Sequence, residues 1–379
     1  MPTISLCMIV KNEEQVLARC LASAKDLVDE IVIVDTGSSD KTKEIASQFT
    51  DRIYDFEWID NFAAARNFAF AKGTGDYLMW LDADDIIQPE DAEKFRAVCE
   101  TLLPHNDTIM MKYNIAFDEH GNPTFSYFRE RVVRNCPAAK WEGAIHEVIT
   151  PFGRIAHSHA AVTHRRKGKS DPLRNLRLFE KLLKKGAAFS PREQFYYARE
   201  LYYAARYADA IAAFEKFLKD GNGWMENNIE ACRVLAQCET ALEHPEKALQ
   251  ALLRSFHYDT PRAEICCELG YYYFARDQFK RASYWYRAAL LSERNDVSGA
   301  FVLEDCYGYL PFLQLCVCCD RLGQREEAVK WNDRAGLLRP QSAAYLHNKK
   351  YFDEPTENGA ENCEETPVSK DTKKEEAPA

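Results

Sequence analysis

The sequence has no excess of positive charge, no long apolar run and too few cysteines for a disulfide scaffold. Its 379 residues include 49 Lys plus Arg against 59 Asp plus Glu, a formal net charge of −10, and phosphate binding needs a basic surface. No apolar run approaches the ~18 residues of a membrane-spanning helix, and the N-terminus lacks the basic region of a signal sequence. Thirteen cysteines are far below the ~8–10% of a disulfide scaffold. We therefore expect a cytoplasmic protein without a membrane span or a nucleic-acid partner.

What is present indicates a folded chain with more than one domain. Hydrophobic residues make up 46% and aromatic residues 12%, and domains usually have ~100–200 residues. Residues 1–168 alternate short β-branched runs with amphipathic stretches, residues 169–350 have a helical pattern throughout, and residues 351–379 are rich in Glu, Lys and Pro. The sequence thus predicts an α/β domain, then an all-α domain, then a disordered acidic tail.

The first segment predicts β-α units on a largely parallel sheet. The predicted strands are Ile4–Val10, Ile31–Val34, Arg52–Asp55, Tyr77–Leu81, Thr108–Phe117 and Tyr127–Arg134. The predicted helices begin at Asn12, after the N-cap Asp40, at Phe62 and at Pro89, and the second of them runs to about Phe49.

In the helical segment, small residues recur twelve positions apart. They form the pairs Ala198/Ala210, Ala236/Ala248, Gly270/Ala282 and Cys316/Ala328, whose second members are separated by 38, 34 and 46 residues. This pattern resembles the tetratricopeptide repeat, which has a period of ~34 residues and uses small residues where paired helices cross. The alternative is an irregular helical bundle, because only one of the three intervals equals that period.

Polar residues follow the predicted parallel strands, where open α/β sheets bind their ligands. These residues are Lys11–Glu14, Asp35–Ser38, Arg66–Asn67 and Asp82–Asp85. Asp82 and Asp84 lie two positions apart at the end of an apolar strand, so an extended backbone would project them in the same direction. Two such carboxylates suit a hard divalent cation such as Mg²⁺ or Mn²⁺. The alternative for this acidic segment is helix capping, above all by Asp85.

Four segments resemble, in the right order, the motifs of family 2 glycosyltransferases with the GT-A fold. They are Ser5–Glu14, Asp29–Thr42, Ala63–Asn67 and Leu81–Asp85, and the resemblance covers roughly the first 165 residues. Two later segments, Trp141–Glu147 and Val162–His164, followed by helical repeats, are similar in layout to a bacterial branch of the family. That branch includes enzymes that glycosylate bacteriocin peptides on cysteine sulfur.

The resemblance implies roles for individual residues on the nucleotide side. It assigns Asp35 to the nucleotide base, and Glu13 or Glu14 to the neighbourhood of the ribose. Arg66 would support the acidic cluster or contact the nucleotide, with a simple ion pair to an aspartate as the alternative. The residues implied in donor binding are Val10, Lys11, Asn12, Glu13, Glu14, Asp35, Arg66 and Asp82.

For the metal, the resemblance implies that Asp84 holds Mg²⁺ or Mn²⁺ at the diphosphate. Asp82 would face the ribose or a metal-bound water, and His164 would be a further ligand. Sugar transfer by direct displacement also needs a carboxylate that takes the proton of the acceptor. Glu147 is the first candidate for this base and Asp85 the second. The alternative for Glu147 is an ion pair with Arg131 or Arg134.

These features together predict an inverting, metal-dependent glycosyltransferase. Its donor would be a nucleotide-diphosphate sugar, with UDP-sugar favoured by the resemblance alone, and its acceptor a peptide, a protein or a glycan bound by the helical repeats. The repeats could instead form a homodimer. The alternative function is a non-catalytic sugar-nucleotide-binding scaffold that uses the repeats for protein interaction.

Overall fold

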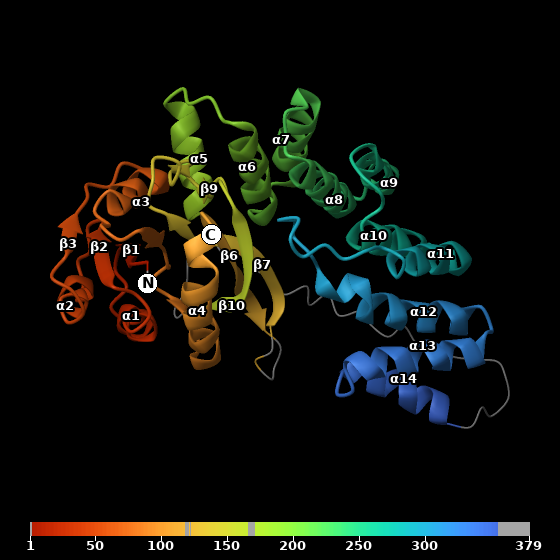
Figure 1. Cartoon of the computed structure of the whole chain (residues 1–379). Coiled ribbons are helices and arrows are strands. Elements are labelled where there is room, and N and C mark those ends of the chain that lie inside the picture. Colours follow the sequence, from red (N-terminus) through yellow and green to blue (C-terminus); the bar gives the residue numbers. More distant parts are fainter. Residues whose placement is uncertain (1, 118–120, 122, 166–170, 355–379) are drawn as a thin grey trace. The chain divides into compact units, whose positions relative to one another are not determined.

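The computed structural model describes residues 2–117, 121, 123–165 and 171–354, and its contacts divide into two compact units (Figure 1). Among the described residues, the first unit ends at Tyr197 and also includes Asp296–Ala300, and the second comprises Ala198–Asn295 and residues 301–354. The predicted boundary at residue 168 and residues 355–379 of the predicted tail lie outside the described residues. An α/β part is followed by an all-α part, which confirms the predicted fold class.

The first unit is built on a mixed eight-stranded sheet with the order β3-β2-β1-β4-β7-β6-β10-β5. Strands β1 to β4 are parallel where they pair, β6 is parallel to β10, and β7 is antiparallel to both β4 and β6. The carboxyl ends of β1, β2, β4 and β10 therefore meet at one edge. The strands are β1 (Ile4–Val10), β2 (Glu30–Asp35), β3 (Ile53–Asp55), β4 (Tyr77–Met79), β5 (Asp85–Ile86), β6 (Thr108–Phe117), β7 (Pro123–Arg134), β10 (Ile155–His164), and a separate pair β8 (Trp141–Glu142) and β9 (Val148–Ile149).

Helices pack on both faces of this sheet, as the buried clusters show. Alternate residues of β1, such as Leu6 and Met8, pack with α1 and α4 on one face. Cys7 packs with α3 and Trp141 on the other. The helices of the first unit are α1 (Leu17–Ala24), α2 (Thr42–Ala46), α3 (Phe62–Phe70), α4 (Pro89–Thr101) and α5 (Arg174–Lys184).

Several predicted elements begin or end elsewhere than the sequence suggested: α2 ends at Ala46 and not near Phe49, and β7 begins at Pro123 and not at Tyr127. Two further differences lie near the polar residues. The helix expected from Asn12 begins only at Leu17, because Asn12 has a φ of 55° and its amide nitrogen donates to Ser38 Oγ at 2.9 Å. The strand expected to reach Leu81 ends at Met79. Both corrections shorten regular structure at the edge where the polar residues gather.

The second unit consists of helices, most of them joined by short turns, with one longer connection over residues 290–308. Among them, α8 packs on α9, α10 on α11, and α12 on α13. Helix α6 crosses from the first unit into the second. The helices are α6 (Pro191–Tyr203), α7 (Tyr207–Asp220), α8 (Met225–Ala241), α9 (Pro245–Arg254), α10 (Ala263–Phe274), α11 (Phe279–Ala289), α12 (Tyr309–Arg321), α13 (Arg325–Leu338) and α14 (Ala343–Asp353).

The twelve-residue spacing of small residues is a real structural repeat. All eight members of the four pairs are buried, one on the first and one on the second helix of each pair. In every pair, the residue five positions before the second small residue has a positive φ, which the sequence does not reveal because only one of the four is glycine. These residues are Ala205, Glu243, Asp277 and Gly323, with φ between 54° and 75°.

We expect Gly270→Val to destabilise the second unit by about 1–3 kcal/mol, the usual cost of overpacking. A Cβ at Gly270 would lie 2.6 Å from Cε1 of Tyr286, and that ring is 1% exposed, so it has little room to move. Chemical denaturation measures the loss, with Tyr271→Ala, at a half-exposed neighbouring position, as the control. An unchanged unfolding midpoint would show that the ring moves aside.

Among the described residues, no helix combines the length and the apolar character that crossing a membrane requires.

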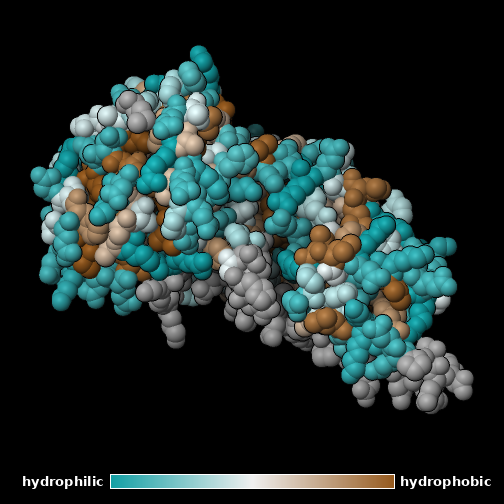
Figure 2. Space-filling view, turned by 60° about the horizontal axis from the view of Figure 1, so that its bottom comes forward, coloured by the Kyte–Doolittle hydropathy of each residue, from teal (hydrophilic) through white to brown (hydrophobic). Residues whose placement is uncertain are grey.

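Large apolar side chains are exposed in the second unit. Leu291 and Leu337 are 85% and 84% exposed. Figure 2 shows groups of hydrophobic residues among hydrophilic ones on the surface of the helical part. Single exposed apolar residues are common in monomers, so they do not by themselves indicate a dimer. A homodimer through the repeats stays a prediction.

Candidate functional site

The acidic segment after β4 forms a turn, not the extended backbone that the sequence suggested. The amide nitrogen of Asp85 donates to the carbonyl oxygen of Asp82 at 3.0 Å, so the chain reverses and β5 begins at Asp85. β5 then pairs antiparallel with β10, in a register that sets His164 opposite Asp85. This pairing joins residues that are 79 positions apart in the sequence.

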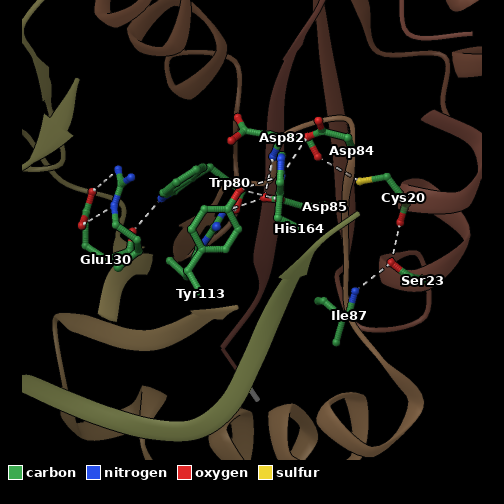
Figure 3. A network of polar contacts seen from close by, with 12 residues as sticks. Cys20, Ser23, Trp80, Asp82, Asp84, Asp85, Ile87, Tyr113, Glu130 and His164 are labelled. Carbon is green, nitrogen blue, oxygen red and sulfur yellow. Dashed lines mark hydrogen bonds and ion pairs between the residues drawn. The ribbon is translucent and has the colours of Figure 1, made fainter. Parts of the chain in front are cut away.

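Asp84, Asp85 and His164 bring one possible metal-ligand atom each to within 4.8 Å of the others. His164 Nδ1 lies 3.4 Å from Asp84 Oδ1 and 3.4 Å from Asp85 Oδ1. Figure 3 shows these side chains converging beyond the end of β10, with Cys20 of α1 on the far side of the turn. Asp82 is outside this group of ligand atoms, so its role as a ligand stays a prediction.

Asp85 is completely buried, and both its carboxylate oxygens have partners. Oδ1 accepts a hydrogen bond from the Tyr113 hydroxyl at 2.8 Å, and Oδ2 accepts from Arg131 at 3.0 Å and from the amide of Asp82 at 3.0 Å. Arg131 is also fully buried, and its guanidinium stacks 3.8 Å from the centroid of Trp80. Asp85 therefore anchors the turn to the sheet.

Arg66 of α3 joins the acidic turn to the segment that contains Glu147. Its Nε donates to Glu147 Oε1 and its NH2 to Asp82 Oδ1, each at 2.6 Å. The guanidinium lies over the adjoining rings of Trp80 and Trp141, 4.9 and 4.8 Å from their centroids. The predicted contact between Arg66 and the acidic cluster is present.

The alternative prediction, in which Glu147 forms an ion pair with Arg131 or Arg134, was wrong. Arg131 pairs with Asp85, and Arg134 pairs with Asp107 at 2.6 Å. Neither arginine is the ion-pair partner of Glu147, which is Arg66.

The pKa values of Asp84, Asp82 and His164 are displaced in different directions. Burial raises the pKa of Asp84 to about 6, with the charges of Asp82 and Asp85 adding to the effect and His164 opposing it. Burial would also raise the pKa of Asp82, but Arg66 and Arg131 outweigh it and lower that pKa to about 2. For His164, burial is outweighed by the hydrogen bond to Asp85 and by the aspartate charges, so its pKa is raised.

On the nucleotide side, the loops after β1 and β2 are joined by hydrogen bonds. Ser39 donates its amide to Asn12 Oδ1 at 2.8 Å, and the amide of Glu13 donates to Thr42 Oγ1 at 2.7 Å. Glu14 accepts from the amide of Lys41 at 3.1 Å. Val10 is buried at the end of β1, beside Asp35 in the register of β2, and Lys11 is exposed.

The two carboxylate oxygens of Asp35 differ in their hydrogen bonds. Oδ2 accepts from the amides of Gly37 and Ser38 at 3.0 and 2.9 Å. Oδ1 is buried and has no hydrogen-bond partner among the described residues. A buried acceptor without a donor is costly, so this oxygen suits a ligand that supplies an N–H.

Sequence reasoning did not find Tyr113, Trp80 or the true role of Arg131. Their contacts depend on strands that are neighbours only in the folded sheet, since β4 lies beside β7 and β7 beside β6. The signal available was the run Arg129-Glu130-Arg131 beside apolar residues in the strand that ends at Arg134, because a charge that becomes buried needs a partner.

The sequence is similar to those of known proteins. Residues 5–104 match the family model described as glycosyl transferase family 2. A glycosyltransferase derived from the SPbeta prophage of Bacillus subtilis, SunS, is 28% identical over 232 residues, 58% of this chain and 54% of its own length. A TPR repeat-containing protein of Synechococcus elongatus is 37% identical over 149 residues, 39% of this chain and 36% of its own length. The chain thus spans about a third to a half of the length of these relatives.

Proposed function

We propose that the protein, whose residues 5–104 match the model of glycosyl transferase family 2, is an inverting, metal-dependent glycosyltransferase. Its donor is a nucleotide-diphosphate sugar, with UDP-sugar favoured, and its acceptor is a peptide, a protein or a glycan. The observation that carries the proposal is the convergence of Asp84, Asp85 and His164 at the edge of the sheet where Asp35 also lies. The helical repeats are proposed to hold the acceptor.

The residues around the turn fit a divalent cation. Two carboxylate oxygens and one imidazole nitrogen suit Mn²⁺, and the carboxylates also suit Mg²⁺. Asp84 and His164 would hold the ion, with Asp85 Oδ1 within reach. When bound, such an ion neutralises the charge that grows on the departing diphosphate.

The remaining chemistry belongs to side chains of this chain. Asp35 Oδ1 accepts an N–H of the nucleotide base. Glu147 takes the acceptor proton at Oε2, while Arg66 holds its Oε1 and fixes its direction. Asp85 is the weaker candidate for the base, because it is completely buried and both its oxygens are engaged.

Asp84→Asn is expected to weaken Mn²⁺ binding by at least about tenfold. In the unchanged protein, Mn²⁺ should bind about tenfold less tightly at pH 5 than at pH 7, since a carboxyl with a pKa of about 6 is mostly protonated at pH 5 and a proton then competes with the ion. The raised pKa of His164 acts in the same direction. Calorimetry measures both effects, with Asp209→Asn, an exposed carboxylate of the second unit, as control.

A thermal-shift panel of UDP-, GDP- and dTDP-sugars with and without Mn²⁺ tests the donor. Binding to the folded state raises the unfolding midpoint by mass action, so one nucleotide should stand out and only with the metal. Sugar release and transfer with that donor then separate the enzyme from a silent scaffold, which would bind the donor without consuming it.

A further inference from the structure

We propose that the first helices of the helical region act in the transfer reaction, because α5 and α6 hold the loop that presents Glu147. This rests on the proposed function, in which Glu147 is the base. Tyr196 and Arg192 are then positioning residues: they contact the loop and not the reacting atoms. Both belong to the first unit, which ends at Tyr197.

The loop before Glu147 has an uncommon backbone. It connects β8 to β9, and within it Gly143 and His146 have φ values of 91° and 53°. A left-handed histidine persists only where its surroundings hold it. Since β9 begins at Val148, any relaxation of His146 would be taken up by Glu147, whose side chain would then turn away from Arg66.

Two aromatic rings lie near the His146 imidazole. The Tyr196 ring of α6 stacks on it with centroids 4.2 Å apart and planes 17° apart. Phe179 of α5 has its centroid 6.4 Å away at an angle of 23°, and its side chain is fully buried. Tyr196 therefore makes the closer ring contact with the loop.

The backbone of the same loop is held as well. Arg192 Nε donates to the carbonyl oxygen of His146 at 3.1 Å, and the Arg192 guanidinium lies 4.8 Å from the Tyr196 ring centroid. Glu193 accepts from the amide of Ala144 at 3.4 Å, while the carbonyl of Ala144 accepts from the amide of Phe62 at 2.9 Å. One turn of α6 thus fixes the loop from one side and the start of α3 fixes it from the other.

Glu147 itself is held by Arg66 of α3 and Arg129 of β7. Arg66 holds its carboxylate at 2.6 Å and Arg129 donates to its carbonyl oxygen at 3.4 Å. A base that must accept a proton in one direction loses rate when it is displaced by about 1 Å. The contacts from α6 are therefore expected to affect kcat through Glu147 and to leave donor binding alone.

The test is a double-mutant cycle between Tyr196→Ala and Glu147→Gln. Tyr196→Ala should lower kcat about 10–100-fold with the donor KM unchanged, and Tyr196→Phe, which keeps the stacked ring, should restore it to within about threefold. In the Glu147→Gln background, Tyr196→Ala should have little further effect, because residues that act through one group are not additive.

The same cycle read in the unfolding midpoint needs no turnover. The shift in unfolding midpoint of the double variant should differ by about 2 °C or more from the sum of the shifts of Tyr196→Ala and Glu147→Gln. Tyr272→Ala is the matched control: Arg276 lies over its ring at the same i,i+4 spacing, but in the second unit, so its shift should add to that of Glu147→Gln.

The outcomes separate the two proposals. Coupling in the midpoint without any sugar transfer would overturn the proposed function and keep the positioning of Glu147 by α6. Additive effects in both readouts, or a fully active Tyr196→Ala variant, would overturn the positioning itself.

Discussion

Glu147→Gln is expected to lower the turnover of the transferase by about 10²–10⁴-fold, the usual contribution of a general base. Glutamine has the shape of glutamate and can still accept from Arg66 Nε, which lies 2.6 Å from Oε1, but it cannot take a proton. Donor affinity should stay within a few-fold of the unchanged protein. Single-turnover kinetics with saturating donor measure the chemical step.

A different result would reassign the base. If donor binding fell together with the rate, Glu147 would serve mainly to hold Arg66 and the turn that contains Asp82. Asp85→Asn would then be the next variant to measure. Asp55→Asn is a suitable control, since this carboxylate is 75% exposed and pairs only with the exposed Lys43 among the ion pairs of the described residues.

Arg131→Met is expected to destabilise the first unit by about 3–5 kcal/mol, because it leaves the buried charge of Asp85 without its ion-pair partner. The side chains of Arg131 and Asp85 are both 0% exposed. The guanidinium carbon of Arg131 lies 3.8 Å from the ring centroid of Trp80 and 4.3 Å from that of Tyr113. Methionine replaces the length of the side chain and not its charge. Chemical denaturation monitored by tryptophan fluorescence measures the loss.

The same strand offers a matched control. Arg134→Met removes an ion pair with Asp107 whose members are 41% and 29% exposed, and such pairs are worth less than about 1 kcal/mol. Adding Asp85→Asn to Arg131→Met should recover part of the stability, since a neutral amide does not need a cation. Equal losses for Arg131→Met and Arg134→Met would contradict the importance of the buried pair.

Prediction from the sequence worked best where local patterns are strong. β1 was predicted with the bounds that the structure has, Ile4–Val10, since it is a nearly continuous apolar run. It worked least well at the loops of the site, where Asn12 replaces the first turn of a helix by a left-handed residue. Hydrogen bonds from another loop override helix propensity there, and no local pattern reports them.

The sequence by itself determined the kinds of residues at the carboxyl edge of the sheet and the small residues at the helix crossings. Asp35 and Asp84 each follow an apolar strand of the predicted parallel sheet, so both reach its carboxyl edge without reference to distant residues. The small residues of the repeat, such as Gly270 and Ala282, are determined in the same way, because close helix packing tolerates little else.

The tertiary structure alone decided which charges pair. Asp85 could have served only to cap a helix, and the folded sheet supplies it with His164 from the paired strand β10 and with Arg131 from β7 instead. Glu147 could have paired with any of several arginines, and the loop held by α6 directs it to Arg66. Ion pairs form over a few ångströms between residues tens of positions apart, so their partners are set by the folded backbone and not by sequence spacing.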